Sequence, residues 1–295
     1  MSALLQPRAP AGRLRELLAS ESPVLAPGAY DALSARLVEA AGFDCVYMTG
    51  FGTAAARLGR PDIGLLTGSE MVDNARAIAG AVGVPVVADA DTGYGNPINV
   101  IRTVRDYEQA GVAGIHLEDQ VMPKRCGHLA GKAVVPQEDM VAKIRAAVAA
   151  RTNPDFLLIA RTDARAPEGL ESALRRAAAY AEAGADMLFV EAPQDEAEVE
   201  AIAATLRGVP LLFNWAEGGR TPPVPLARLT ELGYRLVIFP VGTLLAATAG
   251  MRRLLATLRA DGTPAGALDG LPSLQEFADF IGMTEVRDLE QRFGS

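Results

Sequence analysis

Acidic residues at the ends of short apolar runs are the first candidates for chemistry in this sequence. Asp89 and Asp91 end the run 84–91, and Glu118 lies near the end of the run 114–120. Residues i and i+2 of a strand share one face, so both aspartates are expected to face one site. Carboxylate oxygens suit Mg²⁺, with Mn²⁺ as an alternative, because Mg²⁺ takes one or two carboxylates plus water and substrate oxygens. Histidine and cysteine are too few and too far apart for a zinc site.

The segment 120–135, QVMPKRCGHLAGKAVV, is the second candidate. It sets Cys126 beside Lys124, Arg125 and His128, although the chain has only two cysteines and two histidines. Neighbouring positive charges favour the thiolate form of a cysteine. The glycines of the segment allow movement of the kind that carries a reactive group onto a bound substrate. A solvated basic loop with an incidental cysteine is the alternative.

Further polar residues follow the other apolar runs. Arg161 in ARTDA either anchors a substrate or pairs with a nearby acid, and Tyr47 either faces a site or packs in the core. His116 alternates with apolar neighbours and is expected to be a hydrogen-bonded interior histidine. Asp119 and Asp163 could serve only as helix N-caps. Also at the ends of these runs are Thr49, Gly50, Glu191, Asn214 and Glu217.

Eight apolar runs must position these residues. They span 24–30, 45–50, 84–91, 114–120, 156–164, 187–192, 210–217 and 236–240. Amphipathic segments lie between them, and several end in a glycine that can cap a helix, such as Gly111 and Gly184. Runs this apolar indicate parallel strands buried on both faces. The pattern predicts a (β/α)8 barrel of TIM type, with the active site at the carboxyl ends of its strands. An open doubly wound sheet is disfavoured because no G-x-G-x-x-G follows the first run.

Composition narrows the class of protein. The 295 residues carry a net charge of −8 and 49% hydrophobic residues. Scattered basic residues exclude a nucleic-acid-binding face and an anionic-membrane anchor. No apolar run reaches the roughly 18 residues of a membrane span, and two cysteines make no disulfide framework. We expect one cytoplasmic domain over 1–295, with a barrel at about 14–250 and a C-terminal helical extension at 251–295.

Several motifs together resemble those of one family. DADTGYGN, HLEDQ, PKRCGHLAGK, ARTDA, VEA and NWAEGG occur in order at the expected strand ends. From about Leu14 to Phe293 the chain resembles the isocitrate lyase/phosphoenolpyruvate mutase superfamily. The resemblance implies an α/β barrel whose eighth helix is swapped with a neighbouring subunit, in a homotetramer built as a dimer of dimers. It also implies Mg²⁺ at Asp89 and Asp91, with Glu118 in the surrounding shell.

The same resemblance assigns roles to residues. A small 2-hydroxy or 2-oxo diacid is implied as the substrate, with Cys126 as the acid/base on the loop. The residues implied to contact substrate are Tyr47, Thr49, Gly50, Phe51, Asp89, Gly127, Arg161, Glu191 and Asn214. The residues implied in catalysis are Cys126, His128, Arg161 and Lys124.

Departures from the family pattern bear on the substrate. Methylisocitrate lyases carry an arginine shortly after the last strand, where this chain has Leu245, and their N-x-x-E-F-G is NWAEGG here. These departures disfavour a tricarboxylate substrate. The resemblance as a whole implies a carbon–carbon lyase acting on a 2-hydroxy dicarboxylate, 2-alkylmalate-like or methylisocitrate-like, with oxaloacetate hydrolysis as an added activity. The alternatives are a carboxyphosphonoenolpyruvate-type phosphonomutase and a non-catalytic binding barrel. The sequence leaves the natural substrate open.

Overall fold

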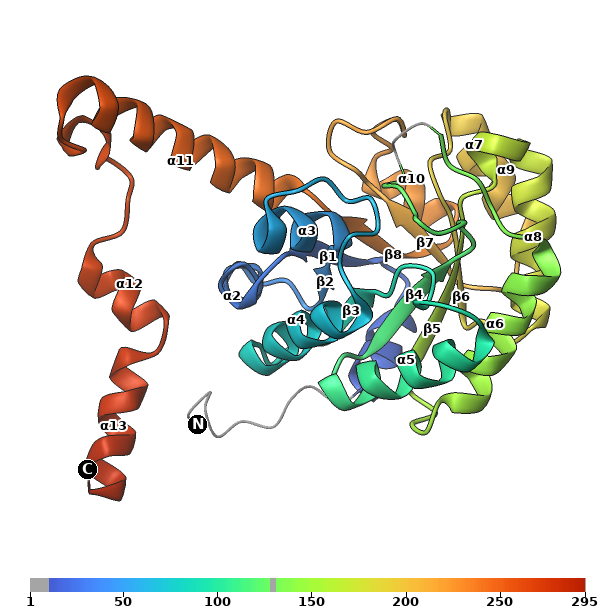
Figure 1. Ribbon diagram of the computed structural model, residues 1–295, viewed down its shortest axis with the longest axis horizontal. Coiled ribbons are helices and arrows are strands. Elements are labelled where there is room, and N and C mark those ends of the chain that lie inside the picture. The colour runs from blue at the N-terminus through green and yellow to red at the C-terminus, as the bar shows by residue number, and fades with distance from the viewer. Residues whose placement is uncertain (1–10, 128–130, 295) are drawn as a thin grey trace. The chain divides into compact units, whose positions relative to one another are not determined.

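Eight parallel strands close into a barrel in which each strand pairs with the next and β8 pairs with β1 (Figure 1). The structure is a computed structural model that describes residues 11–127 and 131–294. The predicted TIM-type barrel is confirmed, and the open sheet is wrong. The strands are β1 Val24–Ala29, β2 Val46–Met48, β3 Val86–Asp89, β4 Gly114–Glu118, β5 Leu157–Thr162, β6 Met187–Val190, β7 Leu211–Asn214 and β8 Tyr234–Phe239.

Helices surround the barrel and connect its strands (Figure 1). They are α1 Ala11–Leu18, α2 Ala32–Ala40, α3 Gly50–Leu58, α4 Gly68–Ala81, α5 Pro97–Ala110, α6 Gln137–Ala150, α7 Arg165–Glu168, α8 Leu170–Glu182, α9 Glu196–Thr205 and α10 Leu226–Glu231. Local sequence sets their ends. Asn96 caps α5 by accepting from the backbone N–H of Asn99, Pro97 starts the helix, and Gly111 ends it at φ 88°.

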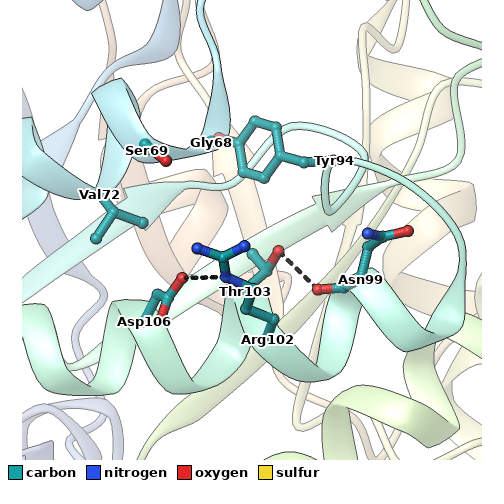
Figure 2. A pocket seen from close by; sticks show the side chains of 8 residues that line it. All are labelled: Gly68, Ser69, Val72, Tyr94, Asn99, Arg102, Thr103 and Asp106. Carbon is teal, nitrogen blue, oxygen red and sulfur yellow. Dashed lines mark hydrogen bonds and ion pairs between the residues drawn. The ribbon is translucent and has the colours of Figure 1, made fainter.

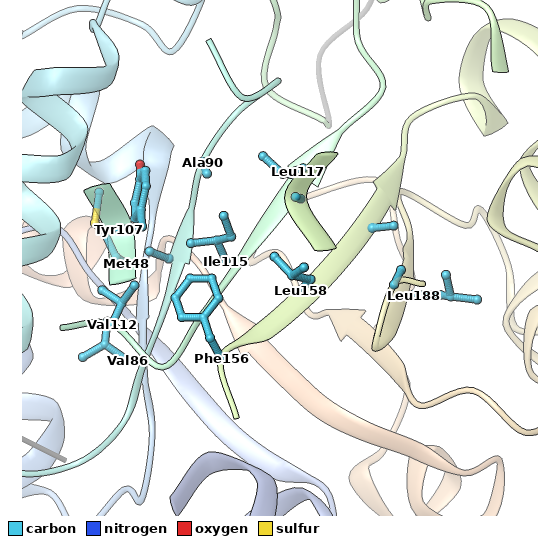
Figure 3. Close-up of a cluster of buried hydrophobic side chains, with 14 of the residues drawn as sticks. Met48, Val86, Ala90, Tyr107, Val112, Ile115, Leu117, Phe156, Leu158 and Leu188 are labelled. Carbon is cyan, nitrogen blue, oxygen red and sulfur yellow. The ribbon is translucent and has the colours of Figure 1, made fainter. Parts of the chain in front are cut away.

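The period-2 alternation of the strands separates two clusters of buried side chains. Ile115 and Leu117 of β4 pack with Leu158 in the cluster between strands and helices (Figure 3). His116, one residue out of phase, contacts Tyr47 and Phe189, whose cluster is the other one. Because neighbouring residues of a strand point to opposite faces, the alternation sends His116 and Glu118 to the same face of β4.

The chain divides into two compact units at Gly242, the barrel and a C-terminal unit of helices. The C-terminal unit contains α11 Gly242–Asp261, the short 3₁₀ helix η2 Ala265–Ala267, α12 Leu274–Phe280 and α13 Met283–Phe293. The predicted helical extension is confirmed, and its organisation with the barrel as a single domain stays a prediction. Over the described parts of the chain, no helix is both long and apolar enough to span a membrane.

Candidate active site

Asp89 and Asp91 are brought together by a tight turn. Asp89 is the last residue of β3, and Asp91 lies beyond the strand at φ 47°. The Asp91 backbone N–H donates to Asp89 Oδ1 at 2.9 Å. The strand alternation predicted for the pair is therefore not what aligns them, because Asp91 has left-handed backbone. Burial raises the pKa of Asp91 to about 6, helped by the negative charge of Asp89 and opposed by Lys124.

Lys124 supplies the positive charge beside these acids. Its buried Nζ lies 2.7 Å from Asp91 Oδ1 and 2.6 Å from Asp62 Oδ1. Burial disfavours the ammonium, but Asp91, Asp89 and Asp62 outweigh it and raise the pKa of Lys124 well above its usual value. Sequence reasoning missed Asp62, which follows α3 and carries no local motif. The sequence analysis identified Lys124 but predicted that its positive charge acts on Cys126. In the structure the charge pairs with Asp62 and Asp91.

Arg161 is held at the end of β5 by three carboxylates. Asp163 accepts from Arg161 Nε at 2.9 Å and from Nη2 at 3.1 Å. Glu118 Oε2 lies 3.2 Å from Nη1, and Glu191 Oε1 lies 3.7 Å from Nη2. The guanidinium also stacks 5.1 Å from the centre of the Phe189 ring. The pairing of Arg161 with nearby acids is confirmed, and its role as a substrate anchor stays a prediction.

Glu191 and Asn214 complete this side of the site. Asn214 Nδ2 donates to both Glu191 oxygens, at 3.3 and 3.2 Å. Glu191 is buried and Asn214 is partly exposed. The structure therefore joins the ends of β6 and β7 to Arg161 through one carboxylate.

Tyr47 and His116 form a buried pair beneath Asp89. Tyr47 Oη lies 2.8 Å from His116 Nε2, which lies 3.6 Å from Asp89 Oδ1. Burial lowers the pKa of His116 to about 4 and raises that of Tyr47 well above its usual value. The expectation of a hydrogen-bonded interior histidine is confirmed. Tyr47 packs and also reaches the site, so its two alternatives are not exclusive.

The turn after β2 packs directly on Asp89. Thr49 caps α3 by accepting from the Gly52 backbone N–H. A Cβ at Gly50 would lie 2.3 Å from Asp89 Oδ2, so only glycine fits there. Phe51 follows on the first turn of α3 and is partly exposed. Helix α3 thus begins beside the carboxylate, and its N-terminus favours negative charge.

The loop after β4 reaches the same site. Gln120 fixes its start by accepting from the Arg125 backbone N–H and donating to the Arg125 carbonyl. The Cys126 backbone N–H donates to the Asp62 carbonyl at 3.2 Å, and the side chain of Cys126 is partly exposed. A Cβ at Gly127 would lie 2.0 Å from Glu191 Oε1. His128, predicted to be catalytic, lies outside the described residues.

Asp119 and Asp163 do not cap helices. Asp119 accepts from Thr162 Oγ1, the Asp163 backbone N–H and Tyr180 Oη at 2.7–2.9 Å. Asp163 binds Arg161 and also accepts from Lys132 Nζ at 2.8 Å. Both acids are fully buried, and they tie β4, β5 and α8 together.

The chemistry of the acids fits a hard divalent cation. Within residues 11–127 and 131–294, no three His, Cys, Asp or Glu side chains converge closely enough to hold a metal by themselves. Mg²⁺ does not require this, because water and substrate oxygens complete its shell. Glu118 Oε1 is buried with no hydrogen-bond partner among the described residues, and Asp89 is buried nearby. An oxygen without a partner costs free energy unless a cation or water satisfies it.

A different hollow lies outside this site, between α4 and α5 (Figure 2). It measures about 160 Å³, and Tyr94 and the ion pair of Arg102 with Asp106 line it. None of the residues predicted to act in chemistry lines this hollow.

The chain matches the phosphoenolpyruvate phosphomutase family over residues 14–259. It is 51% identical to a 2,3-dimethylmalate lyase of Eubacterium barkeri, covering 97% of this chain and 98% of that protein. It is 47% identical to a 2-methylisocitrate lyase of Aeropyrum pernix, covering 94% and 89%. It is 42% identical to a chloroplastic carboxyvinyl-carboxyphosphonate phosphorylmutase of Arabidopsis thaliana, covering 96% and 84%.

Solved structures share the fold of this chain. An oxaloacetate acetylhydrolase in complex with the inhibitor 3,3-difluorooxalacetate superposes with a TM-score of 0.92 at 40% identity, covering 98% of this chain and 99% of that chain. A phosphonopyruvate hydrolase with oxalate and Mg²⁺ superposes with a TM-score of 0.88 at 34% identity, covering 97% and 100%. The barrel with its buried acid cluster defines an α/β-barrel enzyme. The chain belongs to the phosphoenolpyruvate mutase/isocitrate lyase superfamily.

Replacing Lys124 with methionine tests the charge balance of the site. Lys124→Met leaves Asp62 and Asp91 without their shared cation, so we expect the free energy of unfolding to fall by about 3–5 kcal/mol. Urea denaturation measures it. Lys143→Met is the matched control, because Lys143 is also buried but donates to a backbone carbonyl, that of Thr92. An equal fall in the free energy of unfolding of the two variants would show that pairing with carboxylates adds nothing to the stability.

Proposed function

We propose that this protein is a Mg²⁺-dependent carbon–carbon lyase that cleaves a 2-hydroxy diacid of the 2-alkylmalate type into a 2-oxo acid and a carboxylate. The observation that carries the proposal is the cluster of Arg161, Glu191 and the Gly127 backbone beside Asp89, in a chain 51% identical to a 2,3-dimethylmalate lyase. The relatives that bind oxalate and difluorooxalacetate support a small diacid as ligand.

Asp89 and Asp91, with Glu118 beside them, are the residues that would hold the metal. A bound Mg²⁺ would supply positive charge that stabilises an oxygen anion developing on the substrate. The buried acids suit this role because Lys124 and Arg161 balance only part of their charge. Asp89 illustrates the balance: burial raises its pKa, yet the nearby His116, Lys124 and Arg161 lower it below its usual value.

Arg161 orients the substrate and stabilises charge. Asp163 fixes its guanidinium from two nitrogens, so the group is preorganised rather than free to rotate. A carboxylate of the site first accepts the proton of the C2 hydroxyl. The C2 oxygen then forms the carbonyl of the 2-oxo acid, the C2–C3 bond breaks, and its electrons stay on C3, next to a carboxylate. The thiol of Cys126 then donates a proton to C3. This assignment gives the partly exposed cysteine of the loop a chemical role.

A panel of diacids, with and without metal, tests the reaction. We expect turnover of 2,3-dimethylmalate with Mg²⁺, followed by NMR, and loss of that turnover in EDTA with recovery on adding Mg²⁺. Oxaloacetate, the tricarboxylate methylisocitrate and the phosphonate phosphonopyruvate are the competing substrates. Rearrangement of phosphonopyruvate, as opposed to its hydrolysis, without cleavage of any diacid would favour the phosphonomutase alternative, which the 42% identity to the phosphorylmutase supports. No turnover of any diacid would contradict the lyase proposal.

Substitution of Cys126 tests the proton donor. We expect Cys126→Ser to lower kcat by about 10²–10⁴, because a hydroxyl is a much weaker acid than a thiol and general acid catalysis contributes this much. Cys45→Ala is the matched control, since Cys45 is a fully buried thiol whose pKa burial raises to about 12. A change of less than about tenfold in Cys126→Ser would rule out proton donation by this residue.

We also propose a homotetramer in which α11, the helix after β8, is exchanged between subunits. The described side chains of α11, α12 and α13 include none that is buried, and Leu255, Leu274 and Phe293 are 61%, 85% and 67% exposed. Apolar residues exposed in such numbers favour a further protein contact. Sedimentation equilibrium should give four times 30.9 kDa, and a monomer at micromolar concentration would contradict the assembly.

A further inference from the structure

All lysines of this chain are buried. The sequence holds 28 basic residues other than histidine, of which Lys124, Lys132 and Lys143 are lysines and the rest arginines. These three are 3%, 9% and 8% exposed. Lysine and arginine are not interchangeable at such sites, because an ammonium is a compact charge and a guanidinium is a planar fork. The proposed chemistry leaves Lys132 without a role, although it contacts residues of the site.

Lys132 joins the loop after β4 to the end of β5. Its Nζ donates to Asp163 Oδ1 at 2.8 Å and to the Gly127 carbonyl. Asp163, which is fully buried, accepts from Arg161 at the same time. One carboxylate therefore connects a loop cation to the guanidinium of the site. Burial raises the pKa of Asp163, but Arg161 and Lys132 outweigh it and lower the pKa far below its usual value.

Gly127 lies so close to neighbouring side chains that a Cβ atom would clash with them. A Cβ there would lie 2.0 Å from Glu191 Oε1 and 2.5 Å from Arg161 Nη2. On its other side, the Cys126 backbone N–H donates to the Asp62 carbonyl. The Lys132 contact thus fixes the carbonyl of Gly127, on one side of the Cys126–Gly127 unit. The Asp62 carbonyl fixes the N–H of Cys126, on the other side.

We propose that Lys132 and Asp163 are positioning residues that hold the Cys126–Gly127 backbone against Arg161 and Glu191. The positioning itself is a property of the chain, and its catalytic consequence rests on the proposed role of Cys126. A single ammonium meets a carbonyl and a carboxylate oxygen in this small space. We therefore expect that Lys132→Arg does not preserve these contacts, because a guanidinium needs a wider, planar arrangement of acceptors.

Hydrogen exchange tests the positioning without reference to activity. Lys132→Met removes the contact to the Gly127 carbonyl, so the amides of residues 125–127 should exchange at least about tenfold faster through local opening. Lys132→Gln is the second variant, since it keeps a donor of similar length and remains informative if the methionine variant fails to fold. Lys143→Met is the matched control and should leave these amides unchanged. Unchanged exchange in both Lys132 variants would overturn the proposal.

A double-mutant cycle tests the catalytic consequence on the best substrate of the diacid panel. We expect Lys132→Met to lower kcat by about 10–100-fold with a smaller change in KM, because a misplaced group can cost this much. In the Cys126→Ser background the same substitution should cost less than about threefold, since residues acting through one group are not additive. Additive losses would assign Lys132 a structural role only. If no diacid is turned over, the lyase proposal fails while hydrogen exchange still decides the positioning.

Discussion

Buried negative charge at the carboxyl ends of the strands is the constraint on which the rest of this structure depends. Asp89, Asp91, Asp163 and Glu191 are all buried, and so are Glu118 and Asp119. Carboxylates in such a place are stable only when cations or hydrogen-bond donors compensate their desolvation. The described chain provides Lys124, Lys132 and Arg161 within salt-bridge distance, and the donors of Thr162 and Tyr180.

This compensation couples the loop to the barrel. Lys124 and Lys132 both belong to the loop after β4, whereas their partners Asp62, Asp91 and Asp163 follow other elements. The position of the loop therefore depends on its ion pairs with the acids, and the compensation of the acids' charge depends on the position of the loop. A change in either should be felt at Cys126, which lies between the two lysines in sequence and is fixed through the Asp62 carbonyl.

Membership of the superfamily agrees with this arrangement without fixing the reaction. The relatives bear the names of dimethylmalate lyase, methylisocitrate lyase and a phosphorylmutase. The proposed metal site, Arg161 and the proposed proton donor do not by themselves choose among these relatives. The discriminating contacts must lie around the substrate's side chain. Leu245, the departure noted from the sequence, lies on α11 in the C-terminal unit.

The sequence by itself determined the barrel, because seven of the eight apolar runs contain a strand and the eighth, 236–240, overlaps β8, which begins at Tyr234. A glycine also ends several of the connecting helices. It also located Asp89, Glu118 and Arg161, since polar residues that end parallel strands meet at one end of a barrel. Only the tertiary structure decided the partners. Asp62 has no local pattern, and Lys132 ends the PKRCGHLAGK motif without a role assigned from sequence. Folding alone places Asp62 beside Lys124 and Lys132 beside Asp163, far away in the chain. Asp91 meets Asp89 through a left-handed turn that strand periodicity does not encode.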